Sequence, residues 1–100
     1  MLMNTRYQLH GITFEWDIAK AVANLHKHRI LFESACEVFH DPFVCVVEAG
    51  EAEEESRDAA IGMTQNWRLL YVVYTMRSDT IRIVSARMAV KSERRIYEHQ

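Results

Sequence analysis

Apolar side chains recur at every second position near the start of the chain. Ile12, Phe14 and Trp16 are separated by polar residues, and this alternation is the period of a strand with one buried face. The pattern predicts a strand over residues 11–16, which is the first element that we expect. Asp17 follows at the N-cap position of a helix, where its carboxylate can accept hydrogen bonds from the free amides of the first turn.

Apolar residues then change to a spacing of three and four positions, which predicts a helix that ends at His28. Ile18, Ala21, Val22 and Leu25 form the apolar stripe that such a helix normally turns towards the core. Another face of the same helix carries polar side chains, those of Lys20, Asn24 and Lys27.

The remaining chain predicts a second helix, four strands and a final helix. The second helix covers residues 32–39 and ends before Pro42, because the residue before a proline avoids helical conformations. Residues 49–56 are rich in glutamate and are expected to form a solvated, mobile loop. Strands are expected over residues 43–48, 57–64, 68–76 and 80–87, and the final helix over residues 91–99.

The order β-α-α-β-β-β-β-α predicts an α+β fold, with helices packed on one mostly antiparallel sheet. The chain has 49% hydrophobic and 26% charged residues, three glycines and one proline, so we expect one compact domain over residues 1–100. This composition excludes a disordered chain and a collagen-like repeat. No apolar run approaches the roughly 20 residues that cross a bilayer. The first residues also lack the pattern of a signal peptide, so we expect a cytoplasmic protein without membrane contact.

Charge is divided unevenly along the chain. Residues 1–60 hold five Lys and Arg against eleven Asp and Glu, whereas residues 61–100 hold seven against three. A basic second part on a chain of net charge -2 is compatible with a local anion site and argues against indiscriminate binding to nucleic acid. The spacing of the two cysteines, Cys36 and Cys45, is not that of metal ligands, and the same holds for the histidines. We therefore expect no metal site and no cofactor.

Two segments of the sequence are specific enough to suggest a family. The first contains FEWD at residues 14–17 and is followed by Lys20, Asn24, Lys27 and His28. The second contains Arg57, VVYT at residues 72–75, IRIVSAR at residues 81–87, ERR at residues 93–95 and Tyr97. In this order, over about residues 12–98, the chain resembles the BrnT family of toxins from bacterial type II toxin–antitoxin systems.

The resemblance implies a RelE-like fold and a small endoribonuclease that cleaves RNA, free or ribosome-bound, without a metal and so blocks translation. It also implies a BrnA-like antitoxin that neutralises the toxin, brings it to operator DNA and forms a heterotetramer with two toxin chains. The chain departs from the family at Leu31 and Val90, where hydroxyl residues are typical, so two helices are expected to lack a side-chain cap.

Metal-free RNA cleavage uses the neighbouring 2′-hydroxyl as nucleophile, and it needs a base, an acid and cations around the phosphate. Arginine suits the last task because its planar guanidinium stays charged and donates two hydrogen bonds to a phosphate. Taking the residues and the resemblance together, we assign catalysis to Arg87, Arg57, His28 and Tyr97, and RNA binding to Lys27, Arg77 and Arg82.

Arg82 and Arg87 are five residues apart, so a regular strand would point them to opposite faces of the sheet. On such a strand Arg87 would share a face with Ile83 and emerge where the core face ends. Only a bulge or the end of the strand near Ser85 could bring both arginines to one site. We consider Arg87 the first catalytic candidate.

Several of these residues also have a structural explanation. Arg87 would then form an ion pair with Glu93 or Glu98, His28 would interact with the helix dipole, and Tyr97 would only pack its ring. The function has an alternative from another class, a catalytically degenerate toxin that acts as an antitoxin-binding module and transcriptional co-repressor. Intact basic residues favour the ribonuclease, whereas the missing caps and the acidic isoelectric point favour the alternative. A stand-alone small-molecule enzyme is disfavoured, because the sequence has no nucleotide-binding loop or nucleophile motif.

Overall fold

The computed structural model describes residues 3–52 and 55–100, in which six strands form one sheet and three α-helices pack around it. The strands are β1 (Asn4–Leu9), β2 (Ile12–Asp17), β3 (Cys45–Ala52), β4 (Glu55–Met63), β5 (Leu69–Arg77) and β6 (Thr80–Met88). The helices are α1 (Ile18–His28), α2 (Phe32–Cys36) and α3 (Lys91–Glu98), and the 3-10 turn η1 (Glu37–His40) continues α2.

The sheet has the strand order β1-β2-β6-β5-β4-β3. Strands β2 and β6 run parallel, whereas the other neighbouring strands run antiparallel. The predicted α+β class with a mostly antiparallel sheet is thereby confirmed. Within the described residues, no helix is both long and apolar enough to span a bilayer.

Strand β1 is absent from the prediction, and it pairs with β2 through a tight turn. His10 and Gly11 form this turn with φ angles of 48° and 84°, the left-handed backbone that two-residue hairpins need and that glycine adopts readily. β1 lies at the edge of the sheet and alternates exposed with half-buried residues. The observed order is therefore β-β-α-α-β-β-β-β-α.

Strands β3 and β4 extend into the acidic segment that was expected to be a loop. β3 runs to Ala52 and β4 begins at Glu55, and these two residues still form a backbone pair. Residues 53–54 lie outside the described residues. The loop predicted over residues 49–56 is therefore wrong for the described part, because backbone pairing between strands does not require apolar side chains.

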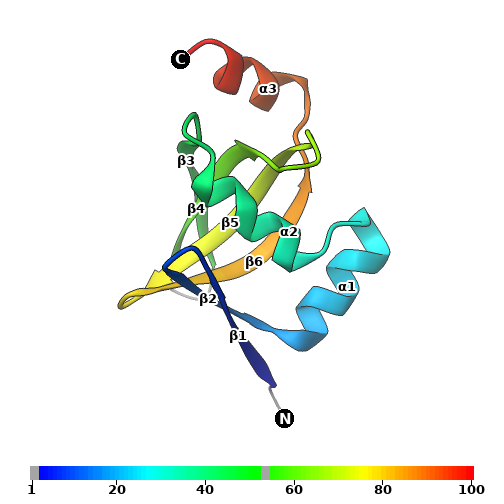
Figure 1. Cartoon of the computed structure of the whole chain (residues 1–100), viewed down its shortest axis with the longest axis vertical. Helices are drawn as coiled ribbons and strands as arrows, with labels where there is room; N and C mark the ends of the chain where they lie inside the picture. Colours follow the sequence, from blue (N-terminus) through cyan, green and yellow to red (C-terminus); the bar gives the residue numbers. More distant parts are fainter. Residues whose placement is uncertain (1–2, 53–54) are drawn as a thin grey trace.

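The core lies on one face of the sheet, beneath α2 and η1 (Figure 1). Phe14 and Trp16 of β2 contribute to it, as the alternation of the first predicted strand requires, together with Val72 and Ile83 of the central strands. Phe32 of α2 closes the core from the other side. The opposite face is polar and basic around Thr75 and Arg82, whereas at the other end of β4 and β5 it carries buried apolar side chains, those of Ala59, Ile61 and Leu69.

The predicted helix caps agree with the structure. Asp17 Oδ1 accepts hydrogen bonds from the backbone N–H groups of Ala19 and Lys20 at 2.8 and 3.4 Å, which begins α1. Leu31 and Val90 make no side-chain cap bond at the starts of α2 and α3. The departure of the chain from the family at these two positions therefore leaves both helices without that stabilisation.

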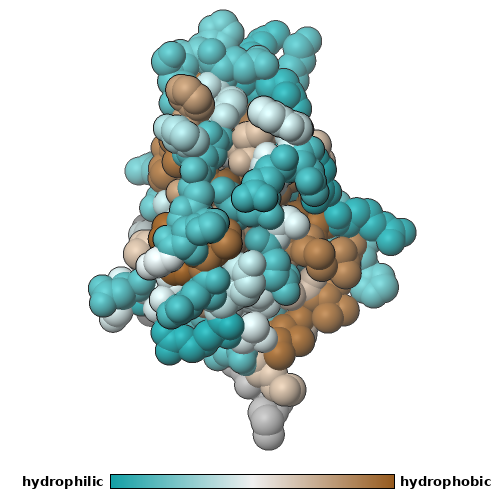
Figure 2. Space-filling view, viewed as in Figure 1, coloured by the Kyte–Doolittle hydropathy of each residue, from teal (hydrophilic) through white to brown (hydrophobic). Residues whose placement is uncertain are grey.

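Of the apolar stripe of α1, only Ala21 packs against the core, so the prediction is wrong for the three larger side chains. Ile18, Val22 and Leu25 are 37%, 52% and 38% exposed. Hydrophobic surface accordingly gathers over α1, at the lower right of Figure 2. The residue of α1 that is buried is Asn24, which the periodicity had placed on a polar face.

Asn24 fastens α1 to strand β6 through buried hydrogen bonds. Its Nδ2 donates to the carbonyl oxygens of Ala86 and Ile30 at 2.9 and 3.1 Å, and its Oδ1 accepts from the Ala86 N–H at 3.0 Å. The pairing of β2 with β6 ends at Arg82. Beyond that point the Asn24 amide supplies the partners that a neighbouring strand would give to the backbone of β6.

Strand β6 contains a bulge that changes which of its residues share a face. Val73 of β5 pairs with Ser85, but the next residue, Tyr74, pairs with Ile83. Val84 is therefore an extra residue with no partner of its own in this ladder. An extra residue shifts the alternation of the following side chains by one position.

The bulge places Arg82 and Arg87 on the same face of the sheet. Arg82 pairs with Thr75 and Arg87 with Tyr71, and these two partners are four residues apart on β5. The bulge that we named as one of two ways to unite the arginines is thus present. The expectation for a regular strand, with Arg87 on the face of Ile83, is wrong.

Candidate functional site

A row of polar and basic side chains crosses the sheet face opposite the core. Thr75 and Arg82 are paired on β5 and β6, and Glu15 of β2 pairs with Arg82 on its other side. Continuing the register of β4 and β5 by one residue puts Arg57 beside Thr75. Four strands therefore contribute neighbouring side chains to one surface.

A cavity of about 320 Å³ opens on this row, and we call it the basic cleft. It is lined by Asn4, Asp17, Lys20, Glu55, Arg57, Thr75, Arg77, Arg82 and Val84. Four of these side chains are cationic and two are carboxylates. The excess of positive charge in a concave site attracts an anion.

Two arginines of the basic cleft are held in place by carboxylates. Arg82 Nη1 lies 2.7 Å from Glu15 Oε2, and Arg82 Nη2 donates to Asn4 Oδ1 at 3.1 Å. Arg77 Nε lies 3.2 Å from Glu55 Oε1, and its hydrogen bond keeps the pKa of that carboxyl below its ordinary value. Oriented guanidinium groups of this kind present their remaining charge in a defined place.

Two buried polar atoms of the basic cleft have no hydrogen-bond partner within 3.5 Å among residues 3–50 and 55–100, whose side chains the structure describes. They are Arg57 Nε and Thr75 Oγ1, which come from neighbouring strands, and the Thr75 hydroxyl is near enough to the Glu55 carboxylate to help lower its pKa. A buried polar group without a partner costs roughly 1–3 kcal/mol, and folded proteins contain few of them. Their occurrence together in a cationic cavity indicates a binding place for a ligand oxygen.

A second cavity adjoins the basic cleft between β6 and α1. It measures about 230 Å³ and is lined by Lys20, Ala23, Asn24, Lys27, His28, Val84 and Ser85. Lys20 and Val84 line both cavities, which therefore form one surface. Five predicted site residues meet on it: Lys27, His28, Arg57, Arg77 and Arg82. His28 also stands in the last turn of α1, where a basic side chain interacts favourably with the helix dipole.

Arg87 lies on the same face, but α3 engages its guanidinium. Nη1 and Nη2 each lie 2.8 Å from a different oxygen of Glu93, and Cζ is 4.3 Å from the centre of the Tyr71 ring. Burial by itself raises the pKa of Glu93, but hydrogen bonds from Arg87 and from the Val90 N–H outweigh it and lower that pKa. The ion pair considered as the structural role of Arg87 is confirmed, whereas its role in catalysis stays a prediction.

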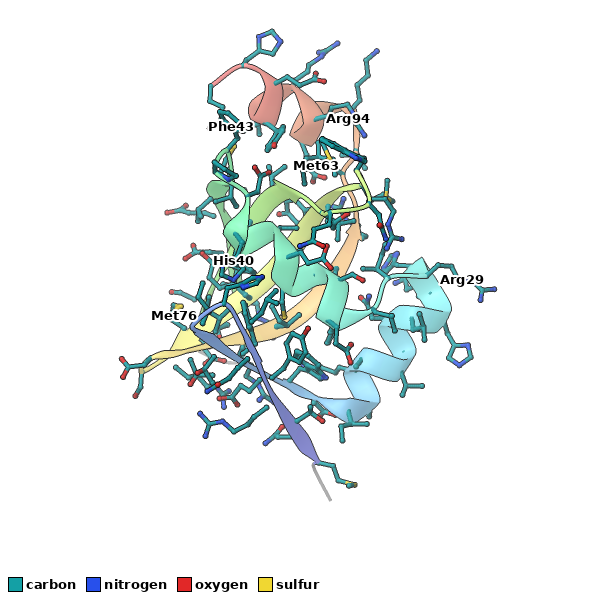
Figure 3. The ribbon with its side chains drawn as sticks, viewed as in Figure 1. Arg29, His40, Phe43, Met63, Met76 and Arg94 are labelled. Atoms are coloured by element: carbon teal, nitrogen blue, oxygen red, sulfur yellow. The ribbon has the colours of Figure 1, made fainter. Side chains whose placement is uncertain are left out.

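Tyr97 lines neither cavity, so the structure does not bring it to the other candidates. Its hydroxyl donates to Asp41 Oδ2 at 2.6 Å, and the Asp41 carboxylate also accepts from the backbone N–H groups of Phe43 and Met63 at 2.9 and 2.7 Å. Figure 3 shows Phe43 and Met63 next to α3. Helix α3 has no buried residue, so the Tyr97 hydroxyl helps to hold it on the sheet.

The Asp41 carboxylate is expected to make the protein less stable in acid. Burial by itself raises the pKa of Asp41, but the hydrogen bonds from Tyr97, Phe43 and Met63 outweigh it, and the pKa lies below the ordinary value of 3.8. A carboxyl with a depressed pKa contributes stability above its unfolded-state pKa. That contribution disappears as the pH falls through the folded-state pKa.

The variant Asp41→Asn tests this expectation by urea unfolding from neutral pH downwards. The amide is a weaker acceptor for three donors, so the variant is expected to be less stable than the wild type at neutral pH. The difference should shrink as the pH falls from about 3.8 towards the lower pKa of the folded state, because the unfolded chain then binds a proton that the folded carboxylate does not yet bind. A difference that is the same at every pH would contradict the role of this carboxylate.

Lys20 and Thr75 are among the six residues of the basic cleft that the sequence-based site did not include. Lys20 had a signal, because it shares a helix face with Lys27 and follows the FEWD segment. Thr75 had none, since threonine is common in strands and its position gives no hint of an unpartnered hydroxyl. Only the packing of β5 between β4 and β6 makes Thr75 part of the site.

Oriented arginines on the open face of the sheet, with two lysines and a histidine of α1 beside them, make up a surface of the side-chain types that suit phosphate. The family model described as "Ribonuclease toxin, BrnT, of type II toxin-antitoxin system" matches residues 16–93, more than three quarters of the chain. The chain belongs to this family, as its resemblance predicted, and is a ribonuclease toxin whose partner is an antitoxin. Comparison with individual curated proteins gave no match.

Proposed function

We propose that this toxin, acting as one domain over residues 1–100, cleaves RNA in the cytoplasm without a metal ion and so blocks translation. In this mechanism a 2′-hydroxyl attacks the adjacent phosphate, the P–O5′ bond breaks, and the 5′-oxygen takes a proton from water, which leaves a 2′,3′-cyclic phosphate and a 5′-hydroxyl. The observation that carries the proposal is the pair of unpartnered atoms, Arg57 Nε and Thr75 Oγ1, in the basic cleft. A phosphate oxygen accepts hydrogen bonds from guanidinium and hydroxyl groups, so one phosphate can complete both.

The arginines of the basic cleft stabilise the charge that develops on the phosphate. A pentacovalent phosphate is more negative than the starting diester, and groups that are already oriented stabilise it without reorganisation. Arg82 and Arg77 meet this condition because Glu15 and Glu55 hold them. Arg57 adds the direct donor beside Thr75.

His28 is the proposed general base of the reaction. Its cavity adjoins the basic cleft, and a neutral imidazole nitrogen can accept the proton of the 2′-hydroxyl. Lys20 and Lys27 bind the phosphates that flank the cleavage position, since both line the same surface.

Arg87 is proposed as a further phosphate contact at the end of the same face. Its side chain remains 35% exposed although Glu93 binds it, so RNA can reach it from solvent. We assign no step in cleavage to Tyr97, because Asp41 holds its hydroxyl away from the two cavities.

The antitoxin is proposed to be BrnA-like. Its DNA-binding part recognises the operator and dimerises, so that the repressing complex contains two toxin and two antitoxin chains. The toxin reaches DNA only through this partner, and the antitoxin neutralises it by covering the basic cleft.

The purified chain is expected to cleave single-stranded RNA in the presence of EDTA and to leave 2′,3′-cyclic phosphate ends, which attack by the 2′-hydroxyl requires. Expression of the chain alone is expected to arrest protein synthesis. Higher salt should weaken RNA binding, because each phosphate contact releases counterions. Gel analysis of the products and incorporation of labelled amino acids measure these effects.

The variant Arg87→Ala belongs in the same assays. Loss of arrest in a folded Arg87→Ala protein would support its contact with RNA, whereas full arrest would leave Arg87 only its structural pair with Glu93. A soluble wild-type chain that neither cleaves RNA nor arrests synthesis would refute the proposal. The non-catalytic co-repressor would then be the better explanation.

A further inference from the structure

Exposed apolar side chains gather around α1 on the side away from the basic cleft. They are Met3, Ile18, Val22, Leu25 and Leu31. Met3 is 61% and Leu31 is 49% exposed, and the Met3 carbonyl accepts a hydrogen bond from the Ile18 N–H at 2.9 Å. Figure 2 shows this hydrophobic surface at the lower right. A contiguous apolar patch on a soluble protein marks an interaction surface.

The patch contains a groove with a rigid floor. The groove measures about 280 Å³, and eight residues line it: Thr5, Trp16, Ile18, Ala21, Val22, Leu25, Leu31 and Glu33. Trp16 is 3% exposed and packs edge-on against Phe32, with ring centroids 5.7 Å apart. The groove can therefore receive apolar side chains without rearrangement of its base.

Helix α1 separates this groove from the candidate RNA site. Val22 and Leu25 line the groove, whereas Lys20 and Lys27 line the cavities on the opposite side of the helix. Asn24 binds the side that faces β6. A helix with its side chains is about 10–12 Å wide, so a segment seated in the groove reaches the lysines by crossing one helix.

The groove is too small to hold a stable partner by itself. A standard protein interface uses roughly 20–30 residues from each partner, whereas eight residues line the groove. The occupant must therefore continue onto neighbouring surface. Across α1 that surface is cationic, which favours carboxylates on the occupant and disfavours a second basic surface.

We propose that the groove is the docking site of the antitoxin. An amphipathic segment of the antitoxin inserts apolar side chains beside Val22, Leu25 and Leu31, and its acidic side chains cross α1 to Lys20 and Lys27. Bound in this way, the antitoxin blocks the surface that RNA needs. The inference rests on the proposed function, because it explains neutralisation only if the basic cleft is the RNA site.

A second copy of the chain fits the groove less well. If two copies of the chain met at the groove and the interface extended across α1, Lys20 and Lys27 of one copy would approach the same lysines of the other. Like charges across an interface weaken binding. An acidic partner gains from the same two lysines. Charge complementarity therefore favours the antitoxin over self-association.

Val22→Lys is expected to weaken binding of the purified cognate antitoxin to the full chain by about tenfold or more, because it places a charge in the groove. Ile96→Lys is the matched control, since Ile96 is also a β-branched residue on a helix and is 47% exposed, against 52% for Val22. The control should change the affinity by no more than about twofold. Titration of each labelled variant with antitoxin measures the two affinities. In the absence of antitoxin, Val22→Lys should still cleave RNA.

Leu31→Ser separates a binding effect from a folding defect. Leu31 is the N-cap of α2 and makes no side-chain cap bond, whereas serine is one of the best N-cap residues. The variant is expected to raise the melting temperature and yet to weaken antitoxin binding. A destabilised protein cannot produce these two effects together.

Unchanged antitoxin affinity in both groove variants would overturn the proposal. It would also be overturned if sedimentation showed a wild-type dimer that Val22→Lys abolishes while antitoxin binding persists, because the groove would then serve self-association. If the groove variants bind the antitoxin more weakly but the wild-type chain cleaves no RNA, the first result supports the docking site and the second refutes the ribonuclease mechanism. The two proposals therefore fail separately.

Discussion

Arg57→Ala is expected to slow RNA cleavage by about 10²–10³-fold, the usual cost of removing one oriented donor from a charged transition state. Arg57 Nε is buried without a partner in the described part of the free toxin, and in the proposed mechanism a bound phosphate supplies that partner. The free energy of unfolding should stay the same or rise, because an unpartnered donor is removed. Single-turnover cleavage and urea unfolding measure the two quantities.

Two further variants make this experiment decisive. Arg94→Ala removes an exposed arginine of α3 that lines neither cavity (Figure 3), and it should cleave RNA at the wild-type rate. Thr75→Val removes the second unpartnered atom with little change of shape, and it should slow cleavage without loss of stability. If Arg57→Ala cleaves RNA at the wild-type rate and Arg87→Ala is inactive, the scissile phosphate binds at Arg87. That result would contradict its proposed position beside Arg57 and Thr75.

Asn24→Ala is expected to lower the free energy of unfolding by about 2–4 kcal/mol, a large part of the total for a small domain. The substitution removes three hydrogen bonds and leaves the buried Ala86 N–H and the carbonyls of Ala86 and Ile30 without the amide of Asn24. Because β2 no longer pairs with β6 at this point, no strand backbone can replace that amide. Thermal and urea unfolding measure the loss.

Lys20→Ala is the matched control for this prediction, since Lys20 stands one turn earlier on the same helix and is exposed. It should change the free energy of unfolding by no more than about 0.5 kcal/mol. Its RNA affinity should fall, because Lys20 lines both cavities. Equal stability of Asn24→Ala and the wild type would mean that α1 is held by other contacts.

Much of the fold could be predicted because its signals are local. The alternation of Ile12, Phe14 and Trp16 and the cap at Asp17 depend on residues that are adjacent in the chain. Strand β1 escaped prediction because an edge strand exposes every second residue and carries few apolar side chains. The extension of β3 to Ala52 and the start of β4 at Glu55 were not predicted for a related reason, since their pairing uses backbone groups that every residue has.

The candidate site was predictable only as a set of residue types. The family pattern and the chemistry of phosphate selected Lys27, His28, Arg57, Arg77 and Arg82, and the structure brings these five onto one surface. Tyr97 belongs to the same pattern but is bound by Asp41, fifty-six residues away in the chain. Spacing tells which residues share a face of one element, whereas it does not tell which elements meet.

The sequence by itself determined the class of fold, most of the helices and strands, the family and the kinds of side chain available for RNA. The tertiary structure alone decided that Arg82 and Arg87 share a face, because the bulge at Val84 depends on pairing with β5. It also decided that α1 binds the sheet through Asn24 and leaves Ile18, Val22 and Leu25 of its apolar stripe exposed. An apolar stripe shows that a helix has a surface to bury. The side of α1 that packs on the sheet is instead the side of Asn24, because the backbone of β6 at Ala86 has hydrogen-bonding groups that β2 does not pair.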